Sequence, residues 1–135
     1  MLHLTRTVYL QMIGHCLDGL PEEGCGLLGG DPATGRAGIC YPARNEAASA
    51  RIYKIDSRDY LRADRDAESR GLEIIGVFHS HTHTEAYPSP TDVDQAPDPT
   101  WHYVVVSLRD LAPSVRSYLI REGKIFEEPV VVAGR

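Results

Sequence analysis

The first regular pattern of apolar positions along the chain is a helical one. Apolar residues recur every four positions, at Val8, Met12, Cys16 and Leu20. Because residues four apart lie on one face of an α-helix, we expect an amphipathic helix over residues 7–20. Proline does not continue a helix, so Pro21 marks its end.

Two more helices are expected further along the chain. Ser57 is a suitable N-cap for a helix that runs to about Arg70, where Gly71 would end it. A shorter helix is expected around residues 91–96, after a proline-rich loop.

Strand-like runs account for much of the remaining sequence. Residues 73–79 are almost continuously apolar, which is typical of a strand that is buried on both faces at the centre of a sheet. Shorter runs predict the other strands, at residues 25–30, 36–42, 51–56, 101–107, 115–120 and 124–132. Helices and strands interleave in the first half, and strands dominate the second. We therefore expect an α/β fold, with one mixed β-sheet flanked by helices.

Length and composition narrow the class of protein. A chain of 135 residues is expected to form a single domain over residues 1–135. The formal net charge of −5 has the wrong sign for a protein that binds nucleic-acid phosphates, so nucleic acid is not an expected partner. No apolar run approaches the roughly 18 residues of a membrane helix, and the N-terminus does not resemble a signal peptide. We expect a cytoplasmic protein without membrane contact, whose oligomeric state the sequence leaves open.

The pattern of cysteines favours a role in core packing over a role in catalysis or disulfide formation. Cys16, Cys25 and Cys40 are odd in number and form no C-x-x-C pair, which argues against a disulfide framework. We expect them to be buried as small apolar side chains. A nucleophilic role for Cys25 is the alternative, but no histidine lies near it in the sequence.

The residues with the clearest chemistry follow the buried strand. His79 and His81 are two positions apart at its end, so both imidazoles point to one face. Asp92 lies eleven residues later, where a folded-back loop can bring in a carboxylate as the third ligand. Two imidazoles and one carboxylate leave a tetrahedral Zn²⁺ with an open position, which is the catalytic arrangement.

Other residues suit hydrolysis at such an ion. Glu22 and Glu23 form the acidic pair just before a compact apolar segment, and one of them can act as general base and then as general acid. Ser89 lies between the expected ligands and can donate a hydrogen bond to the oxyanion of a tetrahedral intermediate.

The full pattern resembles a known family. The chain reads H-x-H-x7-S-x-x-D over residues 79–92, with P-x-E-x-C-G-L-L-x-G upstream over residues 21–30. This combination resembles the JAMM (MPN+) zinc metallopeptidases, and the resemblance extends over the whole chain in the order of its elements. It implies a cytidine-deaminase-like fold. It also implies His79, His81 and Asp92 as zinc ligands, Ser89 as the serine that stabilises the intermediate, and Glu23 as the acid/base.

Three neighbouring residues complete the comparison with the family. Glu22 is then the solvated member of the acidic pair. His83 extends the histidine run, but the family pattern has no ligand there, so we expect a loop residue that lines the cleft. Thr82 stands where many members have proline, which affects the shape of the following loop.

The resemblance also suggests a substrate. Residues 79–89, Tyr53–Ser57, the Ser117-Tyr118 pair and Glu127–Val130 look like bacterial members that act in cysteine synthesis. These hydrolyse cysteine from the C-terminal Gly-Gly of a small ubiquitin-like sulfur-carrier protein. There is no room for the insertions that chain-specific deubiquitinating members carry.

Two alternatives stay open. The first is an isopeptidase that removes a ubiquitin-like modifier from lysine side chains, with the same catalytic set. The second is a non-catalytic module that binds a ubiquitin-like partner, although such relatives usually lose a ligand and none is missing here.

Overall fold

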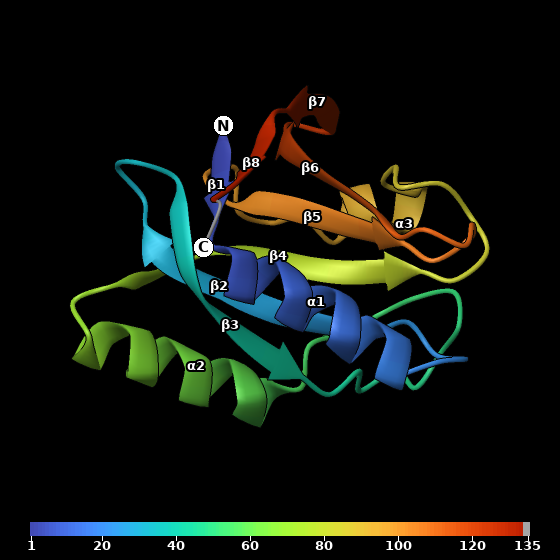
Figure 1. The fold of residues 1–135 in the computed structure, drawn as a ribbon, viewed down its shortest axis with the longest axis horizontal. Helices are drawn as coiled ribbons and strands as arrows, with labels where there is room; N and C mark the ends of the chain where they lie inside the picture. Colours follow the sequence, from blue (N-terminus) through green and yellow to red (C-terminus); the bar gives the residue numbers. More distant parts are fainter. Residues whose placement is uncertain (134–135) are drawn as a thin grey trace.

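The computed structural model describes residues 1–133 as an eight-stranded mixed sheet with helices packed against it (Figure 1). The strand order is β7-β6-β5-β4-β2-β3-β1-β8. The expected α/β class, with one mixed sheet flanked by helices, is confirmed. The helices are α1 (Arg6–Asp18), α2 (Ser57–Ser69) and α3 (Pro90–Asp94). The strands are β1 (Leu2–Leu4), β2 (Cys25–Asp31), β3 (Arg36–Ala43), β4 (Glu73–His81), β5 (His102–Ser107), β6 (Ser114–Arg121), β7 (Lys124–Glu128) and β8 (Val130–Val132).

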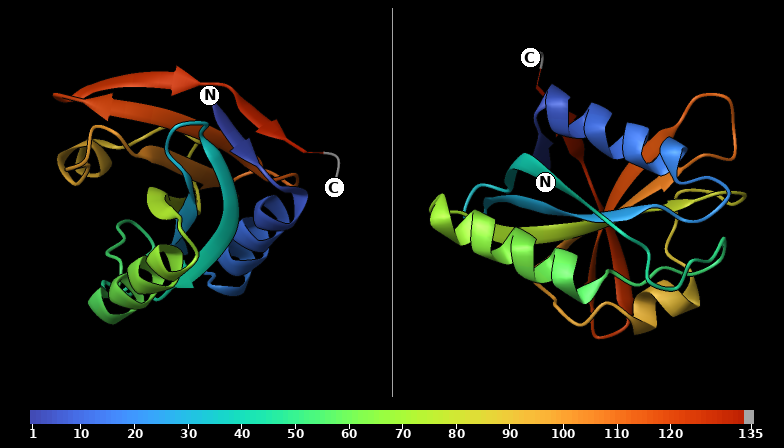
Figure 2. Two further views of the ribbon diagram at one scale, coloured as in Figure 1. Left: turned by 90° about the vertical axis from the view of Figure 1, so that its left-hand side faces the viewer. Right: turned by 90° about the horizontal axis from the view of Figure 1, so that it is seen from below.

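Strand β4 lies at the centre of the sheet. It pairs antiparallel with β2 and parallel with β5, and every residue after Glu73 is buried. Helices α1 and α2 lie on opposite faces of the sheet (Figure 2). Alternate residues of β4 therefore enter two cores, with Val77 packed on the α2 side and Phe78 on the α1 side. The apolar run is explained by burial on both faces.

The first helix agrees with its apolar spacing. Val8, Met12 and Cys16 are its buried residues, and Thr5 caps it by accepting a hydrogen bond from the amide of Val8. The helix starts one residue earlier than expected and ends at Asp18. The three cysteines are free and buried, as expected.

The strand expected at residues 51–56 is wrong. Within that stretch only Ile55 forms a bridge, to Asn45, and its other residues belong to no strand. The following helix is capped by Asp56 rather than Ser57, because the Asp56 carboxylate accepts hydrogen bonds from the amides of Arg58 and Asp59.

Other boundaries differ at the two ends of the sheet. The run expected at 124–132 divides at Pro129 into β7 and β8, which lie at opposite edges of the sheet order. Strand β1 was not predicted, and it pairs parallel with both β3 and β8. The short helix expected at 91–96 covers Pro90–Asp94. None of the helices among residues 1–133 has the length and apolar character to cross a membrane.

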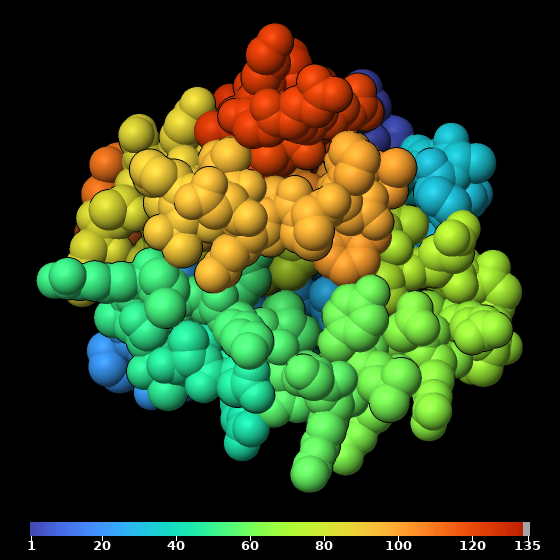
Figure 3. Space-filling view, turned by 180° about the vertical axis from the view of Figure 1, so that it is seen from behind, coloured from blue at the N-terminus to red at the C-terminus, as the bar shows by residue number. Residues whose placement is uncertain are grey.

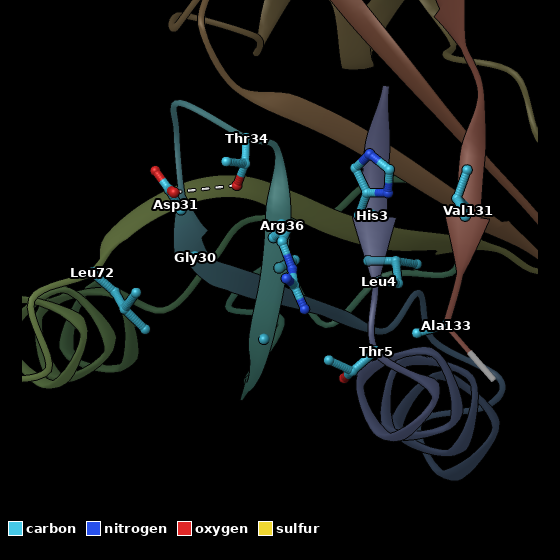
Figure 4. Close-up of a pocket in the computed structure, with 12 residues that line it drawn as sticks. His3, Leu4, Thr5, Gly30, Asp31, Thr34, Arg36, Leu72, Val131 and Ala133 are labelled. Carbon is cyan, nitrogen blue, oxygen red and sulfur yellow. Dashed lines mark hydrogen bonds between the residues drawn. The ribbon is translucent and has the colours of Figure 1, made fainter. Parts of the chain in front are cut away.

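A groove of about 620 Å³ lies at the end of the molecule where β4 begins (Figure 4). It runs across β3, β1 and β8, with His3, Arg36 and Val131 among its lining residues. Two of its glycines differ in their surroundings. A Cβ atom on Gly30 would lie 1.9 Å from the carbonyl oxygen of Arg36, whereas one on Gly38 would meet nothing within 4 Å.

The difference between Gly30 and Gly38 allows the close packing of the hairpin between β2 and β3 to be tested. We expect Gly30→Ala to lower the free energy of unfolding by about 1–3 kcal/mol, because backbone atoms must move to admit the methyl group. The midpoint Tm in a thermal scan should fall by at least about 3 °C. Gly38→Ala on the paired strand is the control and should leave Tm nearly unchanged. Equal Tm values for the two variants would contradict the close packing at Gly30.

Candidate metal centre

Three side chains converge at the end of β4. The Nε2 atoms of His79 and His81 are 3.2 Å apart, and the Asp92 Oδ2 atom lies 3.1 and 3.0 Å from them. All three residues are buried. Among residues 1–133, they form the group of possible ligands that fits one metal ion. The structure thus brings together the three residues that the sequence singles out as ligands.

The two histidines face the same side because of the strand that carries them. Residues two apart on a strand project to one face, and Ser80 between them projects to the other. The Ser80 hydroxyl accepts a hydrogen bond of 2.8 Å from the amide of Gly24, and its own amide donates to the Gly24 carbonyl. These bonds extend the pairing of β2 with β4 beyond Cys25.

Helix α3 presents the third ligand. Ser89 is its N-cap, Pro90 follows at the first helical position, and Ser89 and Asp92 form a capping box. The Ser89 hydroxyl accepts a hydrogen bond of 3.1 Å from the Asp92 amide, and Asp92 Oδ2 accepts one of 2.8 Å from the Ser89 amide. Capping boxes of this kind satisfy otherwise unpaired helix amides. Here the same bonds orient the Asp92 carboxylate toward the histidines.

Two contacts hold the histidine rings in place. The Nδ1 atom of His81 lies 2.8 Å from the carbonyl oxygen of Glu85, a contact that requires the proton on Nδ1. The ring of His79 stacks on that of Tyr53, with centroids 4.2 Å apart and an interplanar angle of 15°. Such outer contacts fix the tautomer and orientation of metal-ligating histidines.

The donor set itself fits a cation. When His81 is neutral with its proton on Nδ1, the lone pair of Nε2 faces the Asp92 carboxylate, which also only accepts hydrogen bonds. Two acceptors 3.0 Å apart in a buried site repel each other unless a proton or a metal ion lies between them. Burial lowers the pKa of His79, so this ring is neutral at pH 7 and available as a ligand. The residues present therefore suit a divalent metal.

Electrostatics hold Asp92 in its charged form. Burial alone would raise the pKa of its carboxyl, but hydrogen bonds with His79 and His81 outweigh that effect and hold the pKa well below its usual range. A carboxylate that stays ionised in a buried site is able to bind a cation over the whole neutral pH range.

Glu23 lies beside the cluster. Cys25 pairs with His79 across the sheet, and the same antiparallel register continued by two residues places Glu23 opposite His81. The side chain is buried, and its Oε1 atom has no hydrogen-bond partner among the described residues. Burial is the main effect that raises the pKa of Glu23, to about 7. A carboxyl that titrates near neutrality is suited to accept and return a proton.

The remaining candidates lie outside the cluster. Glu22 is exposed in the turn before β2, and His83 is exposed in the loop after β4. Sequence patterns gave no sign of the contacts made by Tyr53 and Asn45, because both belong to the segment between β3 and α2 that was interpreted in part as a strand. In Figure 3 this segment (green) and α3 (gold) are neighbours on one face of the molecule.

The centre can be tested through stability. A metal that binds only the folded state should stabilise it by about 2.7 kcal/mol at a hundredfold excess over Kd. We therefore expect Zn²⁺ to raise Tm by roughly 8 °C, and a chelator to reverse the rise. Asp92→Asn should abolish the shift, because the amide keeps the shape of the carboxylate but removes its charge. Asp94→Asn, an exposed residue on the same helix, is the control and should retain it. An equal rise in Asp92→Asn would mean that the ion binds elsewhere.

The chain is similar to a known protein family, to named peptidases and to solved structures. The family model described as prokaryotic homologs of the JAB domain matches residues 5–121. The chain is 41% identical over 122 residues to the CysO-cysteine peptidase of Mycobacterium tuberculosis, covering 90% of this chain and 84% of that protein. It is 30% identical over 127 residues to a probable TtuB-protein conjugate cleaving protease of Thermus thermophilus, covering 92% and 79%. A protein of Desulfitobacterium hafniense, solved in solution, superposes with a TM-score of 0.91 at 33% identity, covering 100% of this chain and 94% of that one.

Proposed function

The chain belongs to the family of prokaryotic homologues of the JAB domain, and from this premise we propose that it is a zinc-dependent hydrolase that releases cysteine from a carrier protein. The bond cleaved is the amide after the C-terminal Gly-Gly of a small ubiquitin-like sulfur carrier. Membership of this family and the similarity to named peptidases make the chain a hydrolase of the protease class. The metal, the residue roles and the substrate are the proposal.

The observation that carries the proposal is the cluster of His79, His81 and Asp92 beside a buried carboxyl. These three residues would hold the ion. When bound, Zn²⁺ supplies Lewis acidity, which makes water acidic enough to lose a proton near neutral pH and polarises a carbonyl.

Glu23 would move the proton. Its Oε1 atom is buried and has no hydrogen-bond partner among residues 1–133, and its pKa of about 7 lets it accept a proton from the attacking water. The same carboxyl then returns the proton to the departing amine. Water is consumed, the carbon–nitrogen bond breaks, and the products are the carrier carboxylate and free cysteine.

Ser89 would stabilise the negative charge on the carbonyl oxygen. Its hydroxyl oxygen accepts the amide hydrogen of Asp92 in the capping box, which leaves the hydroxyl hydrogen free to donate. Because the capping box fixes the side chain before the substrate arrives, the donor needs little reorganisation, and one such donor is typically worth about 2.7–4 kcal/mol in the transition state.

Similarity to the CysO-cysteine peptidase supports cysteine as the leaving group, since it extends over most of both chains. The second candidate is an isopeptidase that removes a ubiquitin-like modifier from lysine side chains. It is favoured by the similarity to the Thermus thermophilus protein, whose name describes the cleavage of protein conjugates. Both reactions would use the same catalytic residues.

The role of Glu23 has a direct test. Glu23→Gln keeps the size of the side chain but cannot accept a proton, so kcat should fall by about 10²–10⁴-fold while zinc content stays at one ion per chain. Glu22→Gln, one residue away and exposed, is the control and should turn over normally. Normal turnover by Glu23→Gln would sink the mechanism.

The substrate is tested by mass spectrometry. A small sulfur-carrier protein that ends in Gly-Gly-Cys is incubated with the enzyme, with and without a zinc chelator, beside a lysyl conjugate of the same carrier. We expect the first substrate to lose one cysteine residue and the chelator to prevent the loss. Cleavage of the lysyl conjugate alone would establish the isopeptidase instead, and cleavage of neither would refute both assignments.

A further inference from the structure

The loop between β3 and α2 is built around the metal centre. Residues 45–56, which we name the 45–56 segment, touch the site through several backbone and side-chain groups. The carbonyl of Ser49 accepts a hydrogen bond of 2.8 Å from the amide of Glu23, and the carbonyl of Ala50 accepts one of 3.3 Å from the hydroxyl of Thr82. The ring of Tyr53 stacks on His79. This segment therefore contacts both the expected acid/base and the ligand strand.

Asn45 holds the segment together from its first residue. Its side chain is buried, and its amide nitrogen lies 3.0 Å from the carbonyl oxygen of Glu23. The other hydrogen bonds of this amide all go to backbone groups of the segment itself. Nδ2 donates to the carbonyls of Ile52 and Ser49, at 3.1 and 3.4 Å, and Oδ1 accepts from the amides of Ala47 and Lys54, at 3.1 and 3.0 Å.

Glu23 depends on these bonds for its position. It precedes β2, which begins at Cys25, so the ladder of the sheet does not hold its peptide groups. Its amide bonds to Ser49 and its carbonyl to Asn45, so both of its backbone groups are held by the 45–56 segment. At the other end of the side chain, Oε1 has no partner among the described residues. The location of the carboxyl is thus set from the backbone.

We propose that Asn45 is a positioning residue, which fixes the carboxyl of Glu23 in front of the ligand cluster by holding its backbone to the 45–56 segment. The inference rests on the proposed acid/base role of Glu23 and deepens it. Displacement of a reacting group by about 1 Å is able to cost a hundredfold in rate. The loss of the Asn45 amide should therefore affect turnover without affecting the metal.

Asn45→Asp is the sharpest variant, because it keeps the shape and replaces the donor with an oxygen that repels the three carbonyls. We expect kcat to fall ten- to a hundredfold, KM to change less than twofold, and zinc content to stay at one ion per chain. In the metal-free protein, hydrogen exchange of the Glu23 amide, followed by NMR, should be at least tenfold faster. The control is Glu46→Gln, which exchanges an acid for an amide at the next residue. The Glu46 side chain is half-exposed and pairs with Lys54. This variant should match the parent protein in every readout.

Three results would overturn the inference. One is a parent-like kcat in Asn45→Asp, and another is unchanged exchange of the Glu23 amide. The third is a fall in kcat that comes with loss of zinc, which would mean a purely structural role. If Asn45→Asp does not fold, Asn45→Ala decides by the same readouts, since it removes the donor without adding charge. Full activity of Glu23→Gln would instead refute the proposed function, so the two failures are distinguishable.

Discussion

Three atoms that are suited to bind one cation lie together at the end of β4. The Nε2 atom of His81 and the Oδ2 atom of Asp92 are 3.0 Å apart, and Glu85 requires the His81 proton to be on the far side of the ring. A buried arrangement of acceptors is unfavourable unless a positive charge lies among them. Much of the surrounding structure holds these atoms in this arrangement.

Several parts of the fold hold the ligand atoms in position. Strand β4 is buried on both faces and hydrogen-bonded on both edges, so its last residues are held in register. The capping box of α3 fixes Asp92, and the 45–56 segment covers the site from a third direction. The ligands therefore come from a strand and a helix, while the expected acid/base comes from the end of a loop. We infer that the loop that carries Glu23 needs its own support, which Asn45 provides through its hydrogen bond to the Glu23 carbonyl.

The sequence predicted most of the fold and the candidate ligands for clear physical reasons. A strand buried on both faces appears as a continuous apolar run, and two histidines two positions apart at its end must share a face. The Asp92 carboxylate follows a serine at a helix start, a pattern with a local cause. These features depend on neighbours in sequence, so they are visible without a structure.

What escaped prediction depends on contacts between distant residues. The alternation in residues 51–56 resembles a strand, but the carbonyl of Ile52 and the amide of Lys54 bond to the side chain of Asn45 instead of a neighbouring strand. Strand β1 is only three residues long, and it forms because β3 and β8 lie on either side of it. The stacking of Tyr53 on His79 likewise joins two segments that no local pattern connects.

We propose that the side chains of His79, His81 and Asp92 together bind one divalent ion. Anomalous diffraction at the zinc edge, from crystals of the protein grown with Zn²⁺, tests it most directly. We expect a single strong peak at about 2.0–2.2 Å from Nε2 of His79, Nε2 of His81 and Oδ2 of Asp92. A peak bound only by other residues, or no peak between these three atoms, would contradict it.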